Sequence, residues 1–187
     1  MALINGTNGN DNLNGTAATD TLRGLDGNDN LFGGFFGDDF LDGGNGNDTA
    51  TYLGFGNNIN ASLETNKATF FGGSGTFISI ENLIGGNNQD VLIGNEVSNR
   101  IDGSFGGDRI FGRAGNDFLI GGAGFDFLEG ELGDDNLRGG DDYGSARRWR
   151  WGRFPSWRQG CRYDDRWQRK RPVSMGGWRR QRSDSRR

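Results

Sequence analysis

Apolar residues recur with a spacing of nine along two long parts of the chain, each standing between mostly polar neighbours. A segment of three residues is too short for a helix, so we expect a short strand with its middle side chain pointing inward. One such strand buries little apolar surface. The units must therefore stack until their apolar residues form one core. These residues are Leu13, Leu22, Leu31, Leu41, Ala50, Leu92, Ile101, Ile110, Leu119, Leu128 and Leu137.

Each unit opens with a glycine-rich turn that ends in an acidic residue. In register, the second half of the chain reads GGNNQDVLI, GNEVSNRID, GSFGGDRIF, GRAGNDFLI, GGAGFDFLE and GELGDDNLR. We number the places of a unit from one to nine, starting at its first glycine. Glycines at places one, two and four permit a positive φ and a close approach of the backbone. The acidic residue stands at place six and the inward apolar residue at place eight.

The first half of the chain repeats the pattern less strictly. It reads GTNGNDNLN, GTAATDTLR and GLDGNDNLF, then a ten-residue unit from Gly33 to Asp42, then GGNGNDTAT. We expect the extra residue to displace the register near Phe35 and Phe36.

Stacking brings the carboxylates and free carbonyls of successive turns to nearly the same place. Rows of carboxylates repel one another unless a hard cation lies between them, and sites made only of oxygen suit Ca²⁺. We therefore expect several calcium ions, bound by the side chains of Asp11, Asp20, Asp29, Asp39, Asp48, Asp90, Asp108, Asp117, Asp126 and Asp135. The carbonyl ligands are expected in the turns around Gly6, Gly9, Gly24, Gly27, Gly43, Gly46, Gly103, Gly106, Gly112, Gly115, Gly121, Gly124, Gly130 and Gly133.

The units resemble the RTX (hemolysin-type) calcium-binding nonapeptide, G-G-x-G-x-D-x-U-x, in which U is a large apolar residue. The resemblance covers residues 4–51 and 85–141. It implies an all-β fold, a right-handed parallel β-roll (a β-solenoid) with two units in each coil and calcium between coils. The pairs expected to share an ion are Asp11 with Asp29, Asp29 with Asp48, Asp90 with Asp108, Asp108 with Asp126, and Asp117 with Asp135.

Two units depart from this pattern. Asn99 replaces an aspartate, and Ala17-Ala18-Thr19 stands where a tight turn is expected. We expect both changes to weaken the calcium sites that depend on them.

Residues 52–84 interrupt the repeats. The stretches 59–63, 68–71 and 77–80 alternate or cluster apolar residues as strands do. The segment Glu81-Asn82-Leu83-Ile84 resembles the end of the spacer found between RTX blocks. We expect a β spacer between two β-roll blocks that continues the stack with wider turns, and the alternative is a flexible linker.

Charge divides the chain into two parts. The net charge of −4 combines residues 1–146, which hold 6 basic and 22 acidic side chains, with residues 147–187, which hold 15 basic and 3 acidic ones. The first part is acidic and poor in large apolar groups, so we expect it to stay expanded without calcium. Because the ions bind only the stacked state, their binding free energy would drive folding.

The basic tail, residues 142–187, contains all five tryptophans of the chain. The tryptophan codon read one base later encodes glycine, and counting in nines from Gly139 puts Trp149, Trp151 and Trp157 at glycine places. We therefore expect the tail to be the repeat array translated out of frame, and to be disordered. The alternatives are a solvated basic run and an arm that binds nucleic acid or anionic membranes.

Several classes of function are excluded by composition. The chain has no histidine and one cysteine, Cys161, so it lacks Ser-His-Asp or Cys-His catalysis and a Cys₄ zinc site. We expect no catalytic activity, no specific nucleic-acid partner and no transmembrane segment. The leading hypothesis is a calcium-binding secreted-type module; the alternative is adhesion or self-association through outward-facing Phe32, Phe40, Phe111, Phe118 and Phe127.

The resemblance also bears on location. It implies an extracellular protein and a type I exporter, which reads an uncleaved signal near the C-terminus. A frameshifted tail would lack that signal, so we expect export of the in-frame relative rather than of this product.

Overall fold

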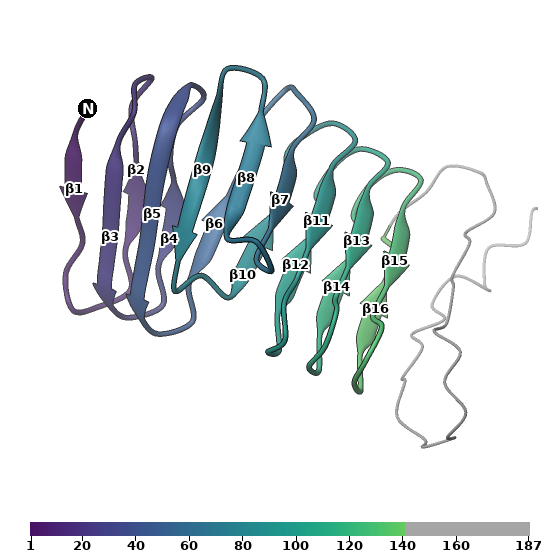
Figure 1. Cartoon of the computed structure of the whole chain (residues 1–187). Coiled ribbons are helices and arrows are strands. Elements are labelled where there is room, and N and C mark those ends of the chain that lie inside the picture. Colours follow the sequence, from purple (N-terminus) through teal and green to yellow (C-terminus); the bar gives the residue numbers. More distant parts are fainter. Residues whose placement is uncertain (141–187) are drawn as a thin grey trace, which may run out of the picture.

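The computed structural model describes residues 1–140, whose strands form two sheets that run side by side along an elongated stack (Figure 1). No helix occurs in this part of the chain, so no helical segment there could cross a membrane. The expectations for residues 142–187 lie outside the described residues.

Successive strands alternate between the two sheets, except that β7, β8 and β9 all lie in the nine-stranded sheet. The nine-stranded sheet contains, in spatial order, β1 (Leu3–Asn5), β3 (Thr21–Asp26), β5 (Gly37–Asn45), β9 (Gly73–Ile78), β8 (Lys67–Phe70), β7 (Asn60–Ser62), β11 (Val91–Ile93), β13 (Arg109–Phe111) and β15 (Phe127–Glu129). The seven-stranded sheet contains β16 (Asn136–Arg138), β14 (Phe118–Ile120), β12 (Arg100–Asp102), β10 (Asn82–Ile84), β6 (Thr49–Thr51), β4 (Asn30–Phe32) and β2 (Asn12–Asn14).

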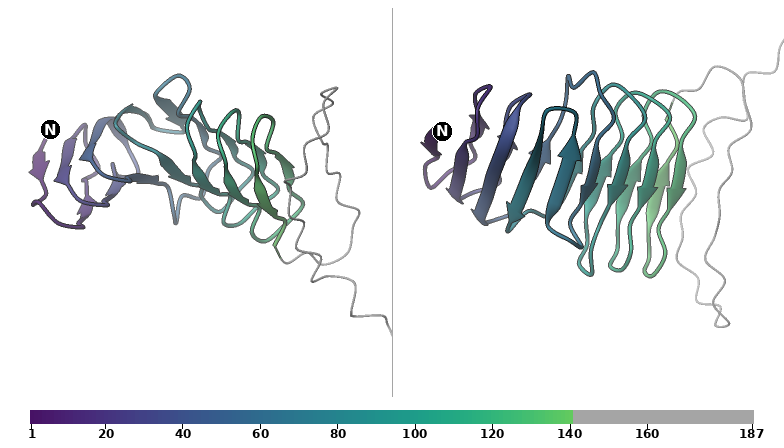
Figure 2. Two further views of the ribbon diagram at one scale, coloured as in Figure 1. Left: turned by 90° about the horizontal axis from the view of Figure 1, so that it is seen from below. Right: turned by 45° about the horizontal axis from the view of Figure 1, so that its top comes forward.

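Two units make one coil, as the nonapeptide pattern predicts. Ile4 pairs with Leu22, and Ile101 pairs with Leu119, so equivalent residues of neighbouring coils are 18 apart. Each coil stacks on the next in parallel, and Figure 2 shows the coils succeeding one another along the axis. The prediction of an all-β solenoid of stacked repeats is confirmed.

The ten-residue unit does not shift the strands. Leu22 of β3 pairs with Leu41 of β5, a separation of 19. The turn that contains Phe35 and Phe36 takes up the extra residue, and both side chains are exposed. The expected displacement is therefore confined to the turn, because a slip within the strand would turn the apolar face outward.

The segment between the blocks continues the nine-stranded sheet. β9 pairs in parallel with β5, and β7 pairs in parallel with β11. Between them lies β8, which is antiparallel to both of its neighbours. The antiparallel strand lies within the spacer, outside the two repeat blocks, and the short turns on either side of β8 can join only antiparallel strands. Strands β3, β5 and β9 are also longer than the three residues expected.

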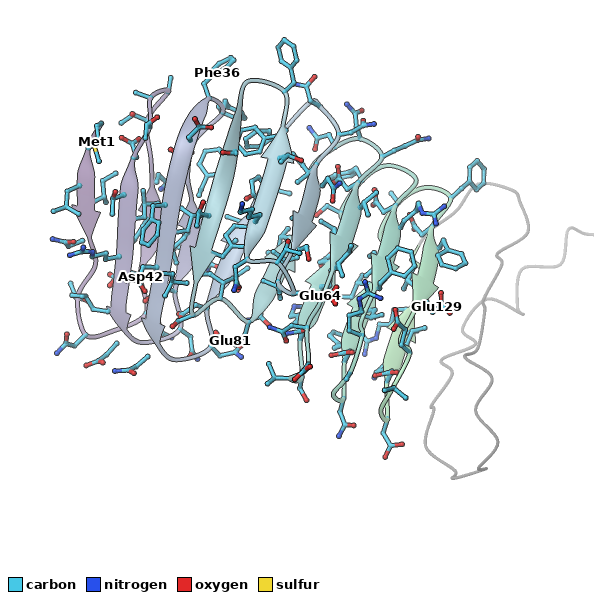
Figure 3. All side chains as sticks on the ribbon, viewed as in Figure 1. Met1, Phe36, Asp42, Glu64, Glu81 and Glu129 are labelled. Atoms are coloured by element: carbon cyan, nitrogen blue, oxygen red, sulfur yellow. The ribbon has the colours of Figure 1, made fainter. Side chains whose placement is uncertain are left out.

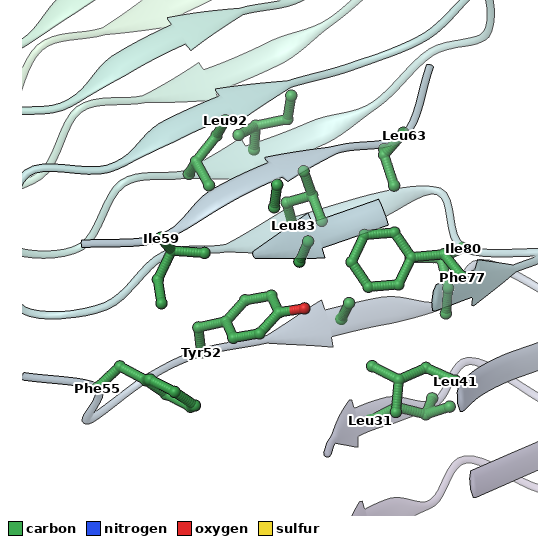
Figure 4. Packing of buried hydrophobic residues seen from close by; sticks show 14 of the residues in the cluster. Leu31, Leu41, Tyr52, Phe55, Ile59, Leu63, Phe77, Ile80, Leu83 and Leu92 are labelled. Atoms are coloured by element: carbon green, nitrogen blue, oxygen red, sulfur yellow. The ribbon is translucent and has the colours of Figure 1, made fainter. Parts of the chain in front are cut away.

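The core is a row of inward side chains that runs the length of the stack. The place-eight residues from Leu13 to Leu128 are buried, and Leu137 at the last described coil is partly covered. Near Ala50, the smallest of them, the aromatic side chains of Tyr52, Phe55 and Phe77 fill the interior (Figure 4). The central segment therefore widens the core and joins the two runs of repeats into one apolar interior.

Candidate metal centre

The place-six acidic residues lie at the ends of the turns, where each turn enters a strand. Their side chains point into the stack, so eight of the ten predicted aspartates are buried, at 6% exposure or less. Asp11 and Asp126 are half-buried. The buried eight are Asp20, Asp29, Asp39, Asp48, Asp90, Asp108, Asp117 and Asp135.

Apart from Asp11, each of these aspartates accepts a main-chain N–H from the neighbouring coil at Oδ1. The main-chain N–H of Asp11 donates to Oδ1 of Asp29 at 2.8 Å, and the N–H of Asp117 donates to Oδ1 of Asp135 at 3.0 Å. The same bond joins every pair predicted to share an ion; the remaining pairs are Asp29 with Asp48, Asp90 with Asp108, and Asp108 with Asp126. The structure therefore brings all five predicted pairs into direct contact.

The second carboxylate oxygen distinguishes two kinds of turn. In the first kind the turn itself supplies a donor. Oδ2 of Asp11 accepts from the N–H of Thr7 at 2.6 Å and from its hydroxyl at 2.9 Å. Thr16 does the same for Asp20, and the N–H of Gly86 donates to Oδ2 of Asp90 at 2.6 Å. We call these capped turns.

Asn99 completes this first kind. Its Oδ1 accepts from the N–H of Asn95 at 2.8 Å, and its Nδ2 donates to the carbonyl of Glu81 at 2.8 Å. A neutral amide thus satisfies both the donor and the acceptor that face it. The four capped turns belong to the first coil of each run of repeats, which begins at Gly6 or at Gly85.

In the second kind of turn, Oδ2 is buried and has no donor. We call these open turns; their aspartates are Asp29, Asp39, Asp48, Asp108 and Asp117. In every open turn the place-two residue has a positive φ, as in Arg113 with 78°. The others are Leu25, Gly34, Gly44 and Ser104. A positive φ strains the backbone of any residue other than glycine. Leucine, serine and arginine in this conformation therefore mark a constrained turn.

The turns of Asp126 and Asp135 share this backbone geometry. Gly122 and Glu131, at their second places, have φ values of 102° and 68°. The second run of repeats therefore keeps one turn geometry from the unit of Asp108 to its end.

The place-one glycines leave an oxygen-lined space between coils. A Cβ on Gly85 would lie 2.6 Å from Oδ2 of Asp90 and 2.7 Å from the carbonyl oxygen of Gly103. A Cβ on Gly112 would lie 2.8 Å from the carbonyl oxygen of Gly130 and would also clash with Oδ2 of Asp117. A carboxylate of one coil and a carbonyl of the next thus face the same point.

The two sets of predicted carbonyls lie differently. Place-one carbonyls face the place-six side chains of the preceding coil. Among the predicted glycines, those of Gly24, Gly43, Gly103, Gly121 and Gly130 face a carboxylate, whereas that of Gly112 faces the Asn99 amide. Place-four carbonyls face the place-four glycine of the next coil instead, as Gly9 faces Gly27 and Gly115 faces Gly133. The structure thus brings place-one carbonyls, but not place-four carbonyls, close to the carboxylates.

Burial changes the acidity of several of these carboxyls. Loss of solvation raises the pKa of Asp39 to about 6, that of Asp117 to about 7 and that of Asp108 to about 8. Burial also raises the pKa of Asp48, Asp90 and Asp135. By contrast, hydrogen bonds from Thr16 lower the pKa of Asp20, whose turn is capped. Among residues 1–140, no ion pair serves the open carboxylates.

These residues fit a hard, oxygen-preferring cation. Residues 1–140 contain no group of three acidic side chains that could hold a metal alone. Main-chain carbonyls must complete any site, and the place-one carbonyls are in position to do so. Carboxylate and carbonyl oxygens are the ligands that Ca²⁺ takes in proteins.

The sequence pattern did not identify Glu81 as a place-six residue. Its Oε2 accepts from the N–H of Asp48 at 2.8 Å, the position that an aspartate holds in the other coils. The alignment of Leu83 with the place-eight residues could have revealed it, because Glu81 precedes Leu83 by the same two positions. Glu81 thus continues the row of acidic residues from the first run of repeats to the second.

Comparison with known proteins agrees with this geometry. A family model described as RTX calcium-binding nonapeptide repeat (4 copies) matches residues 5–36, 34–50, 84–119, 93–128 and 111–145. These matches together cover more than half of the 187 residues. No curated protein matches the chain.

Proposed function

The chain belongs to the family of RTX calcium-binding nonapeptide repeats, and from this premise we propose a calcium-binding module whose folding is driven by Ca²⁺ held between stacked turns. The observation that carries the proposal is the set of five buried Oδ2 atoms without a donor. A buried, unpaired carboxylate is costly, and a divalent cation would remove that cost at every open turn.

The energetics favour coupling between binding and folding. Without an ion, folding moves ionised carboxylates from water into the interior, which costs free energy. The raised pKa values of Asp108 and Asp117 reflect this cost. The unfolded chain keeps these groups solvated. Because the ligands of one ion come from two coils, only the stacked state binds it well. Ligand free energy then becomes folding free energy.

We propose that the open turns hold the tightly bound ions. Three of these ions would each lie between a pair of aspartates: Asp29 with Asp48, Asp108 with Asp126, and Asp117 with Asp135. Asp39 and Asp48 would provide further carboxylate ligands for calcium. In the capped turns, a calcium ion would have to displace the donors that already serve Asp11, Asp20 and Asp90. These three remain members of the proposed ligand set, but with weaker sites. The capped coils begin the two proposed blocks, residues 4–51 and 85–141, on either side of the spacer 52–84.

RTX repeat proteins are typically extracellular and their repeats structural. We propose that this repeat module has no catalytic activity and that its in-frame relative leaves the cell unfolded through a type I exporter. Extracellular calcium sites work at roughly 10⁻⁴–10⁻³ M, far above cytosolic calcium. The array would therefore fold only after export.

The alternative, adhesion through outward-facing phenylalanines, has weaker support. Phe32, Phe40, Phe111, Phe118 and Phe127 are half-buried rather than exposed. The guanidinium groups of Arg100 and Arg138 lie 5.0 and 4.7 Å from the ring of Phe118, and Arg109 lies over Phe111 and Phe127. The rings of Phe111, Phe118 and Phe127 are thus covered by neighbouring side chains.

Circular dichroism tests the proposal. In EDTA we expect the full chain to lose its β-sheet signal, and millimolar Ca²⁺ should restore it. Equal Mg²⁺ should not, since Mg²⁺ demands a smaller, nearly octahedral site and sheds its water reluctantly. A spectrum that is insensitive to calcium would refute the proposed function.

A further inference from the structure

The turns of the roll form two rims of different chemistry. We define the upper rim as the turns that lead into the nine-stranded sheet, together with the β8–β9 turn. They are residues 16–19, 34–38, 53–58, 71–72, 86–89, 104–107 and 122–125, at the top of Figure 1. The lower rim comprises the turns that lead into the seven-stranded sheet, together with the β7–β8 turn. They are residues 7–10, 25–28, 44–47, 64–66, 79–80, 95–98, 113–116 and 131–134.

Large apolar side chains gather on the upper rim. Six of them are between 48% and 75% exposed, namely Phe35, Phe36, Leu53, Phe71, Phe105 and Phe125. They include all five phenylalanines that are exposed within residues 1–140. Figure 3 shows Phe36 projecting from the top of the stack, beyond the end of β5.

Charge separates the two rims further. Apart from the place-six aspartates, the upper rim carries one charged residue, Asp38. The lower rim carries six, namely Asp26, Glu64, Glu96, Arg113, Glu131 and Asp134. The upper rim could therefore leave water without desolvating a charge at most of its turns, whereas the lower rim could not.

The apolar residues of the upper rim are held in place along an extended line. Phe35 packs against Phe32 and Phe55, with ring centroids 5.2 and 5.0 Å apart. Phe105 pairs across the coils with Ala123. From β5 to β15 the sheet spans six strand spacings of about 4.8 Å, so the line is about 30 Å long.

We propose that the upper rim docks on the interfacial region of a lipid bilayer, with its phenylalanine rings inserted among the lipids. The side chains project from separate turns and leave gaps that a rigid protein partner would have to match, whereas fluid lipid fills them. The backbone at the exposed Gly54, Gly56 and Gly72 still needs hydrogen-bond partners, which headgroups and interfacial water supply. Insertion therefore stops at the interface.

The same features select the lipid. An anionic surface would repel the acidic residues 1–146 and attract the basic residues 147–187, whereas a zwitterionic surface leaves binding to the apolar rim. We therefore expect binding to zwitterionic phosphatidylcholine. The proposal rests on the calcium-driven folding proposed above, because the rim exists only in the stacked state.

Flotation with phosphatidylcholine vesicles in millimolar Ca²⁺ tests this inference with the full chain. The test variant combines Phe105→Asn with Phe125→Asn, and the control variant combines Val97→Asn with Leu132→Asn. The control side chains are exposed to a similar degree on the lower rim of the same block. Losing each phenylalanine should lower the vesicle partition coefficient about tenfold. The coefficient of the test variant should therefore fall about a hundredfold, while that of the control should match wild type.

The outcomes separate the two proposals. Circular dichroism of each protein in Ca²⁺ reports folding independently, so a chain without a calcium-dependent β signal contradicts the proposed function. A folded wild-type chain that does not float refutes the lipid proposal. Equal binding by wild type and test variant refutes it as well, since the basic tail would then explain flotation. Phe105- and Phe125-dependent dimers without flotation would assign the rim to a second copy of the chain.

Discussion

Replacing Asp117 by asparagine should remove one calcium site while making the calcium-free roll easier to fold. Oδ2 of Asp117 is buried without a donor, and Oδ1 accepts only the N–H of Asn99, at 2.8 Å. Asn99 shows that an amide fits this environment, because its Nδ2 donates to the carbonyl of the preceding coil. The variant thus keeps the shape of the turn and loses its charge.

The magnitude follows from linkage. Once calcium exceeds the dissociation constant, each bound ion adds about 1.4 kcal/mol to the unfolding free energy per tenfold rise in calcium. Asp117→Asn should therefore lower that slope by about 1.4 kcal/mol per tenfold. In EDTA at pH 8 the variant should be more stable than wild type. Burial raises the pKa of Asp117 from 3.8 to about 7, so keeping the group ionised in the folded state costs up to about 4 kcal/mol.

Urea unfolding followed by circular dichroism at several calcium activities measures the slope. The β signal that each protein retains in EDTA at pH 8 compares their calcium-free stabilities. The matched control is Asp90→Asn, which changes an aspartate in a capped turn, where Gly86 already donates to Oδ2. Its calcium slope should fall less than that of Asp117→Asn, and only at calcium activities high enough to fill the weaker capped site. The distinction between open and capped turns would be wrong if both variants lost the same slope, or if Asp117→Asn lost none.

Three further predictions concern the space between coils, acidity and the join between the blocks. Gly112→Ala places a methyl group where the carbonyl of Gly130 and the carboxylate of Asp117 converge, so it should cost about 1–3 kcal/mol in Ca²⁺. Gly56→Ala, where a Cβ meets nothing within 4 Å, should be nearly neutral in the same urea titration. In EDTA, the raised pKa values of Asp39, Asp117 and Asp108 mean that the folded state binds more protons than the unfolded state between about pH 4 and 8. Stability should fall as pH rises through this window, so the β signal should grow when the pH is lowered from 8 to 5; an unchanged or weaker signal would contradict the assigned burial. Glu81→Ala removes the acceptor of the Asp48 N–H and should destabilise the roll by about 1–3 kcal/mol, whereas an unfolding midpoint equal to that of wild type would show that Glu81 does not link the blocks.

The repeat pattern was sufficient to predict the fold and the aspartate pairs. A spacing of nine with one inward residue in each unit predicts that the units stack. The resemblance to RTX repeats, which wind two units into each coil, adds that Ile101 lies beside Leu119, as the structure shows. The same spacing places the place-six carboxylates one coil apart. The repeat itself can be recognised from periodicity, whereas the number of units in a coil is what the resemblance to RTX repeats implies.

The difference between open and capped turns could not be predicted in this way. It depends on the sign of φ at place two, where Arg113 and Ser104 have positive values although neither is glycine. Gly86, which could adopt that conformation freely, instead donates to Asp90. The position of the unit in the stack therefore matters more than the residue at place two.

The central segment was predictable only in outline. Its strand-like stretches indicated that the sheet continues, but nothing in them required β8 to reverse direction. Phe77 and Tyr52 are buried against the core, and this tertiary packing sets the arrangement of the hairpin. Glu81 was missed because the segment before it lacks the glycines that mark a unit elsewhere.

Anomalous X-ray scattering from crystals of the calcium-loaded chain would test the central claim most directly. The account predicts peaks between coils, beside Oδ2 of Asp29, Asp39, Asp48, Asp108 and Asp117, and weaker peaks or none beside the capped Asp11, Asp20 and Asp90. A folded roll without peaks at the open turns would contradict the claim that calcium between the turns holds the stack together.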